Sequence, residues 1–155
     1  MIPVSSLTPE SLTALLDDAV VEYDLQGGTD IYVTGLAFNF WLRLDAERPI
    51  IILSTYWDFK EDAAELDKLR CVDALNSNLI MIQFFIGSPG NRLSGHYALP
   101  IHDALDPRQL LRVARMFAEV FRSAVTSSDH LDIIEPWPDC TSEDQGTVLP
   151  TGPLN

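Results

Sequence analysis

The segment VDALNSNLIMIQFFI, residues 72–86, passes from helical to extended character within a few residues. Its first part has the residue types of a helix end, and Asn76, Ser77 and Asn78 stand at the change. Seven of the next eight residues are apolar. Because side chains alternate between the two faces of a strand, this segment predicts a strand that is apolar on both faces.

The two faces of this strand differ in composition. One face holds only β-branched or aromatic residues, and we expect it beneath the helices: Ile80, Ile82, Phe84 and Ile86. The other face is expected to point outward near Trp41 and holds Leu79, Met81, Gln83 and Phe85. An exposed apolar patch usually marks an association surface. Three occupants remain open: a second copy of the chain in a homodimer, the chain's own residues 131–137 folding back, or another protein.

Asn76 and Asn78 admit two interpretations. Their amides are suited to binding a ligand, but Asn at a helix C-terminus also tolerates left-handed dihedrals and bonds nearby backbone. The second interpretation accounts for the abrupt change of structure. We therefore predict a structural hinge at this pair and not a binding site.

Cap and turn residues divide the rest of the chain into elements. Thr8-Pro9 and Asp106-Pro107 each place a capping side chain before a proline, which predicts that helices begin there. A further helix over residues 61–76 has an apolar stripe formed by Leu66, Leu69, Val72 and Leu75. Strands are predicted over residues 20–25, 31–36, 37–44, 49–57, 79–86 and 93–99. Consecutive strands with short turns predict an α+β fold, an antiparallel β-sheet with three helices packed mainly on one face.

The length of 155 residues suits one domain with a substantial core. We place this α+β domain at residues 1–137. From residue 138 onward the sequence is polar, acidic and rich in proline, which predicts a flexible C-terminal tail.

The formal net charge of −13 is unevenly distributed, because no Lys or Arg occurs before Arg43 or after Arg122. Two acidic end segments would repel polyanions, which argues against nucleic acid and anionic membranes as partners. No apolar run approaches the ~20 residues of a membrane helix, and the first residues lack the pattern of a secretory signal. Cys71 and Cys140 lie far apart and suggest neither a disulfide framework nor a zinc site. These features predict a cytoplasmic protein with reduced thiols.

The last predicted helix carries four arginines within roughly 80° of one another on a helical wheel: Arg108, Arg112, Arg115 and Arg122. The opposite side of the helix is apolar and holds Leu110, Phe117, Phe121 and Val125. The arginine stripe is a local reversal of sign on an acidic chain. Two interpretations remain open: a solvated face paired with acids of the same molecule, or a surface for an acidic partner, a second subunit or the chain's own acidic tail.

The histidines are His96, His102 and His130, and none has a metal-ligand spacing with another His or Cys. His96 alternates with Ser94 and Ala98 and is expected on the less buried face of its strand. No segment fits a nucleophile elbow or a phosphate-binding loop. We therefore predict no metal, cofactor or catalytic residue. The alternative is a small-ligand or enzyme pocket near His96 and His102, which a deep cavity lined by both histidines and by acids would favour.

Four stretches of the chain resemble the YbjN family of small bacterial domains, described as sensory transduction regulators. They are LTPESLTALLDDA (residues 7–19), the strand meander over residues 31–57, VDALNSNL (72–79) and ALPIHDALDPRQLLRVARMF (98–117). The resemblance rests on the order of caps, strands and helices and includes no catalytic signature. It implies a fold like that of type III secretion chaperones and a non-enzymatic, regulatory or chaperone-like role.

The sequence thus predicts a cytoplasmic, acidic domain of YbjN type that acts through protein contacts and needs no cofactor. The residues expected to make these contacts are Arg108, Arg112, Arg115, Arg122, Trp41, Met81 and Phe85. The identity of the partner stays open.

Overall fold

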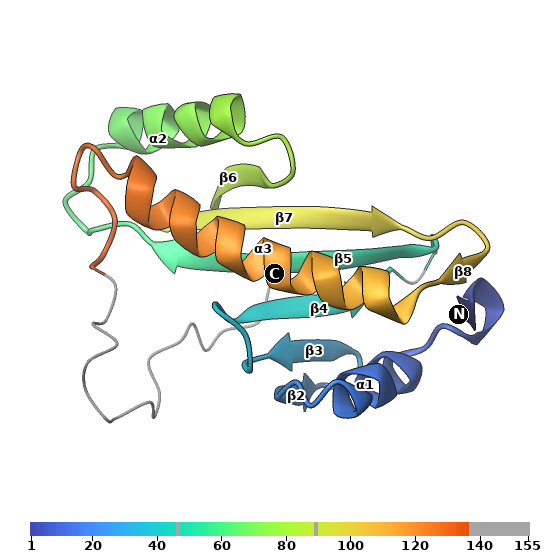
Figure 1. Ribbon diagram of the computed structural model, residues 1–155. Helices are drawn as coiled ribbons and strands as arrows, with labels where there is room; N and C mark the ends of the chain where they lie inside the picture. Colours follow the sequence, from blue (N-terminus) through green and yellow to red (C-terminus); the bar gives the residue numbers. More distant parts are fainter. Residues whose placement is uncertain (46, 89, 137–155) are drawn as a thin grey trace.

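The computed structural model of the chain describes residues 1–45, 47–88 and 90–136, so the tail predicted from residue 138 lies outside the described residues. A six-stranded sheet has the strand order β2-β3-β4-β5-β7-β6, and every neighbouring pair is antiparallel (Figure 1). Its strands are β2 (Tyr23–Gln26), β3 (Asp30–Val33), β4 (Phe40–Leu44), β5 (Ile50–Asp58), β6 (Gln83–Gly87) and β7 (Arg92–Pro100). A separate short ladder, which we did not predict, joins β1 (Ile2–Pro3) to β8 (Ala104–Leu105).

The α-helices of the described chain are α1 (Pro9–Asp18), α2 (Glu65–Asn78) and α3 (Pro107–Ser128), and a 3-10 turn, η1 (Val4–Ser6), precedes α1. α3 crosses one face of the sheet diagonally, with α1 near β2 and β3 and α2 beside β6 (Figure 1). The predicted α+β class is confirmed: an antiparallel sheet with helices packed mainly on one face.

Side-chain caps begin α1 and α3, as predicted. The Thr8 hydroxyl accepts a hydrogen bond from the Ser11 N–H at 3.2 Å, and the Ser11 hydroxyl accepts one from the Thr8 N–H at 3.0 Å. The Asp106 carboxylate accepts a hydrogen bond from the Arg108 N–H at 2.9 Å. These caps satisfy backbone donors that have no partner inside the helix, and the proline after each cap has no such donor.

Aromatic contacts between α3 and the sheet form the centre of the core. Phe121 is fully buried and stacks on Phe84 of β6 with the ring centroids 5.8 Å apart. It also lies 5.0 Å from Phe38, which precedes β4. Phe117, one turn earlier on α3, meets Phe40 of β4 at 5.4 Å. The apolar side of α3 is thus held against strands on both halves of the sheet.

The strand predicted over residues 79–86 begins only at Gln83. Ile82 and Phe84 are each 2% exposed in the core, as predicted, and Ile86 is half-buried. The prediction for Ile80 is wrong, because this side chain is 99% exposed. Residues 79–82 form a bend between α2 and β6, where the two-residue alternation of a strand does not apply. For the same reason Leu79, predicted to point outward, packs against the core.

The side of α2 that packs against the core differs from the side predicted from the sequence. Cys71 and Leu75 are its buried residues, whereas Leu66 and Leu69 of the predicted stripe are 57% and 51% exposed. The helix contacts β6 at one edge of the sheet and a short part of α3. Because these two neighbours offer little area, α2 buries a narrow stripe and leaves part of its apolar surface in solvent.

Asn76 is structural, as predicted, but through a different contact. Its Nδ2 donates to the Phe84 carbonyl and its Oδ1 accepts from the Phe84 N–H, both at 2.9 Å. The side chain thereby satisfies backbone groups on the outer side of an edge strand. Asn78 donates to the Ala74 carbonyl within α2 at 2.9 Å, and neither Asn is left-handed. The junction is a clamp between α2 and β6 and not a left-handed hinge.

Residues 131–136 fold back within the chain, but not over the outward face of β6. Ile134 pairs with Phe59 beyond the end of β5, and the Lys60 N–H donates to the Ile133 carbonyl at 2.8 Å. Ile133 and Ile134 are 7% and 4% exposed and belong to the core. The segment is therefore held by an extension of β5, whose backbone groups there have no β4 partner.

Gly95 of β7 permits the close approach of α3, because an added Cβ would lie 2.8 Å from the Phe121 ring. We expect G95A to lower the free energy of unfolding by about 1–3 kcal/mol, as overpacking of a dense core does. F121L makes room at this position, so G95A should cost less in an F121L background. A double-mutant cycle by chemical denaturation measures this coupling, and additive effects would contradict the contact.

Val20, which follows the C-cap residue Ala19 of α1, has a left-handed backbone with φ of 54° although it is β-branched and 91% exposed. A residue with a Cβ loses about 1–2 kcal/mol in this conformation, which glycine adopts freely. We expect V20G to raise the free energy of unfolding by about 0.5–1 kcal/mol, after the extra backbone entropy of glycine is subtracted. V20A keeps the Cβ and should gain less. Chemical denaturation compares the variants, and a V20G protein no more stable than V20A would rule out strain at this turn.

Candidate interaction surfaces

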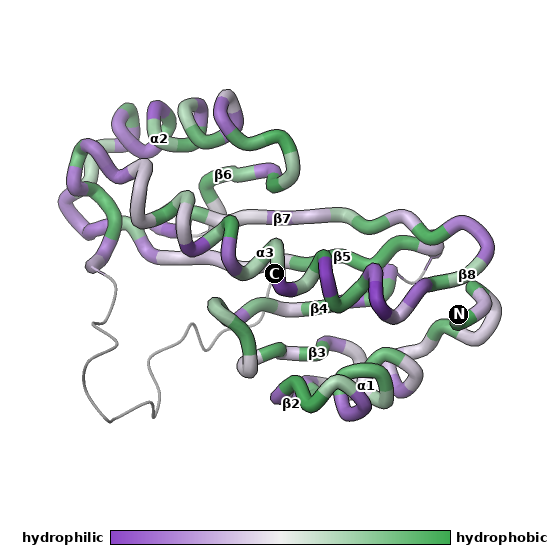
Figure 2. Tube along the Cα trace, in the orientation of Figure 1, coloured by the Kyte–Doolittle hydropathy of each residue, from purple (hydrophilic) through white to green (hydrophobic). Residues whose placement is uncertain are grey.

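The outward side of α3 carries the predicted arginine face, formed by Arg108, Arg112, Arg115 and Arg122. The first three side chains are exposed and Arg122 is half-buried, while the opposite side of α3 faces the core as predicted. Figure 2 shows hydrophilic and hydrophobic residues recurring along α3. Within the described chain, the ion pairs include none with Arg108, Arg112 or Arg115. One exposed acid, Glu119, lies in the same stripe, so the face keeps a net positive charge.

The face of the sheet opposite α3 carries a second buried cluster, formed by Tyr32, Trp41 and Tyr56. Trp41 lies 4.7 Å from Tyr32 and stacks on Tyr56 at 5.8 Å, with an interplanar angle of 10°. Its indole N–H donates to the Gln26 side chain at 3.1 Å, and the Arg92 guanidinium lies 4.1 Å above the Tyr56 ring. Because Trp41 is 2% exposed, it is a packed member of this aromatic row and not an exposed anchor.

The predicted association residues are only partly brought together. The strand register places Trp41, Ser54, His96 and Gln83 in one row across the sheet. Phe85 packs edge-on against His96 with the ring centroids 4.6 Å apart, and Met81 lines a cleft with His96. The structure therefore gathers Met81 and Phe85 around His96 and separates them from Trp41 by strand β5.

This cleft, named here the His96 cleft, has a volume of about 550 Å³ and is open to solvent. Ile52 of β5, Ala98 of β7 and Met81 from the bend supply much of its apolar lining. No carboxylate lines it, and His102, exposed beyond the end of β7, is not part of it. His96 thus lies on the less buried face of its strand, as predicted, but no His–acid constellation is formed in the cleft.

The environment of His96 favours its neutral form. Burial, and to a lesser degree the positive charge of Arg43, lowers the pKa of His96 below its ordinary value of 6.5. A neutral imidazole can both donate and accept a hydrogen bond, so His96 adds polar character to the cleft without adding charge near neutral pH.

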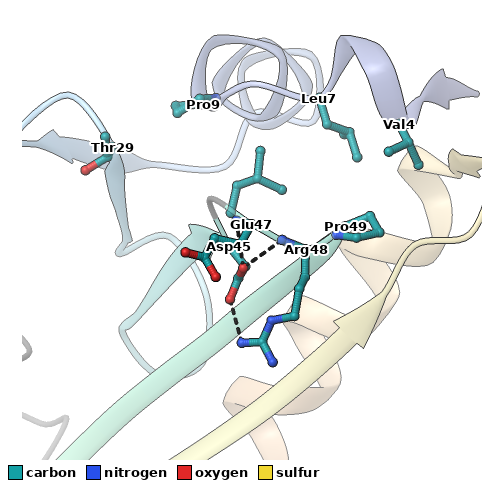
Figure 3. A pocket seen from close by; sticks show the side chains of 9 residues that line it. Val4, Leu7, Pro9, Thr29, Asp45, Glu47, Arg48 and Pro49 are labelled. Carbon is teal, nitrogen blue, oxygen red and sulfur yellow. Dashed lines mark hydrogen bonds and ion pairs between the residues drawn. The ribbon is translucent and has the colours of Figure 1, made fainter.

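A second cleft, of about 450 Å³, lies between the segment before α1 and the β4–β5 connection (Figure 3). Val4 and Leu7 line one side of it. On the other side Asp45 accepts hydrogen bonds from the Arg48 guanidinium at 2.8 Å and from the N–H groups of Glu47 and Arg48. These contacts, the guanidinium first, lower the pKa of Asp45 to about 2. Asp45 and Arg48 satisfy each other, so this pair offers no free acid or base to a ligand.

In the described parts of the chain, no three His, Cys, Asp or Glu side chains gather where a metal ion would bind. None of the described helices combines the length and hydropathy needed to cross a bilayer. Cys71 is buried, and burial raises the pKa of its thiol to about 11. Cys140 lies outside the described residues.

The arginine face was predicted from the sequence, and a pocket near His96 and His102 was kept as the alternative; the cleft found contains His96 without His102, and the cleft beside Asp45 was not predicted. Each cleft joins segments that are distant in sequence, such as residues 52 and 81 at the His96 cleft. The local signal available was the run of large apolar residues over 79–82, longer than one buried strand face requires. Because residues 79–86 were all assigned to one strand, the bend over residues 79–82 that exposes Ile80 was not predicted.

The protein is a small α+β domain with surfaces suited to binding. Its antiparallel sheet has helices mainly on one face, α3 presents a cationic surface, and the two clefts described above are open to solvent. Residues 8–128 match the model of the YbjN family, described as "Putative bacterial sensory transduction regulator", and the chain belongs to this family. The predicted resemblance is thereby confirmed. A search of curated proteins found no match.

A solved structure supports the assignment of the fold. The chain is similar to the protein in "Crystal structure of YbjN, a putative transcription regulator from E. coli", with a TM-score of 0.72 and 13% sequence identity. The match covers 88% of this chain and 100% of that chain. At this identity the likeness shows a shared fold.

The lowered pKa of His96 predicts a pH dependence of stability. Below about pH 6.5 the unfolded chain binds a proton that folded His96 resists, so the free energy of unfolding should decrease as pH falls from about 6.5 toward the lower folded pKa and should level off below it. H96Q should remove this part of the decrease, and H102Q, at an exposed site, is the matched control. Denaturation between about pH 5 and pH 7.5 tests this. Identical pH profiles for wild type and H96Q would contradict it.

Proposed function

We propose that this chain is a non-enzymatic, cytoplasmic regulatory domain that binds an acidic segment of a protein partner through the arginine face of α3. The observation that carries the proposal is the exposure of Arg108, Arg112 and Arg115 without an ion pair to any described residue. On a chain of net charge −13, acids of the same molecule are abundant, yet none of the described ones forms an ion pair with these three side chains.

The spacing of the three arginines suits a short acidic segment. Residues 108, 112 and 115 follow one another by one helical turn, so their Cα atoms span about 10 Å along α3. Guanidinium groups bind carboxylates through two parallel hydrogen bonds, which gives orientation as well as attraction. A long polyanion would also meet the acidic remainder of the chain and be repelled, which favours a local acidic segment over nucleic acid.

Family membership supports a regulatory role. The family is described as "Putative bacterial sensory transduction regulator", and the E. coli protein of similar fold as "a putative transcription regulator". An acidic domain lacks the extended basic surface that DNA phosphates require, so we assign regulation to contacts with another protein. The alternative of a ligand receptor or enzyme at His96 and His102 has less support, because the His96 cleft contains neither His102 nor a carboxylate.

A charge-reversal experiment tests the arginine face. R112E combined with R115E should abolish capture of acidic proteins from a lysate of the native host, because two charges change sign and the net charge of the contact falls by four units. The matched control is R48E with R70E, which changes the net charge equally at exposed side chains outside α3. Both variants should keep the melting temperature of the wild type within a few degrees, since exposed charges contribute little stability.

Quantitative mass spectrometry of the captured proteins gives the readout. Proteins retained by the wild type and by the control, but lost with R112E and R115E, are the expected result. Their retention should also weaken with added salt, because exposed charges are screened over about 10 Å at 0.1 M ionic strength. Equal capture by both variants would overturn the proposed function.

A further inference from the structure

Ile80 is the most exposed large apolar side chain of the described chain, at 99%. It stands on the bend between α2 and β6, next to Met81, which is 47% exposed. Leaving a whole isoleucine in water forfeits the free energy that burial of its apolar area would provide. Two neighbouring side chains of this kind distinguish the bend from ordinary, singly scattered apolar surface residues.

The His96 cleft lies directly beside this protruding side chain, and Ile80 forms part of its rim. The cleft arises because β6 begins at Gln83, opposite His96, while β7 continues to Pro100. The last residues of β7 therefore extend beyond the edge strand, and Ala98 is exposed there. A projecting apolar side chain and an apolar recess thus occupy the same small surface.

The charge of the cleft sets it apart from the rest of the molecule. Its lining contains no Asp, Glu, Lys or Arg, and the imidazole of His96 is its one titratable group near neutral pH. Two chains of net charge −13 repel each other over most orientations. A contact at an uncharged patch brings no carboxylate against another, so the electrostatic cost of pairing is smallest there.

From these observations we infer that the His96 cleft and Ile80 form the contact of a two-fold homodimer, in which Ile80 of each copy enters the cleft of the other. A two-fold axis brings the same patch of both copies together, and such a contact requires a self-complementary surface. A projection and a recess side by side meet this requirement, because one rotation satisfies both at once. The inference is independent of the arginine face, which lies on the outward side of α3.

Sedimentation velocity over about 1–500 µM tests the dimer. The wild type should dimerise, and I80E should raise the dissociation constant by about 100-fold or more, because every dimer contains the Ile80 contact twice. The control is V20E, which places the same charge at an apolar side chain that is 91% exposed and far along the chain. Wild type that is monomeric at the highest concentration, or I80E that pairs as well as V20E, would overturn the inference.

A cross-linking experiment locates the contact. Chains with I80C are mixed with differently tagged chains carrying A98C, so that an 80–98 disulfide can form only between molecules. We expect this link in good yield, and V20C mixed with A98C should give little. Equal yields from the two mixtures would show that any dimer uses another surface.

Discussion

The distance between α3 and the sheet is set where the Phe121 ring meets the backbone of Gly95. With no side chain at this point of β7, the ring reaches the strand itself and stacks on Phe84 of the neighbouring β6. Phe117 then meets Phe40 on the other half of the sheet, which fixes the direction in which the helix crosses. Because the apolar side of α3 packs against the sheet in this way, the arginines on the opposite side of the helix point into solvent.

The two faces of the sheet are stabilised by different means. The helix side is apolar and filled by rings and branched side chains, as layered packing requires. The other side contains the row of Tyr32, Trp41 and Tyr56, in which the Trp41 indole donates to the Gln26 side chain and the Tyr32 hydroxyl accepts from Asn39. Stacking and the cation–π contact with Arg92 hold this row together on the side of the sheet away from α3.

The edge strand β6 and the bend before it form the surface proposed for the homodimer. Asn76 satisfies both outward backbone groups of Phe84, so on the side away from β7 the edge strand is held by α2. The chain before β6 bends away from the sheet, and this bend produces both the exposed Ile80 and the recess beside β7. The domain therefore has two separate candidate binding surfaces, the cationic side of α3 and the uncharged, apolar His96 cleft.

The sequence by itself determined the starts of α1 and α3, the antiparallel sheet, the outward arginines and the place of His96, because caps and side-chain periodicity act within a few residues. The start of α2, which has no side-chain cap, lies four residues later than predicted. It placed Ile82 and Phe84 in the core correctly but not Ile80, because alternation holds only while the backbone stays extended. Tertiary structure decided where that strand begins, which stripe of α2 is buried, and that Ile133 and Ile134 pack at the end of β5 and not over β6. It also decided that Trp41 is buried and that a cleft opens at His96. Each of these depends on which distant strands become neighbours, and strand order and register are set by the packing of the whole sheet beneath α3.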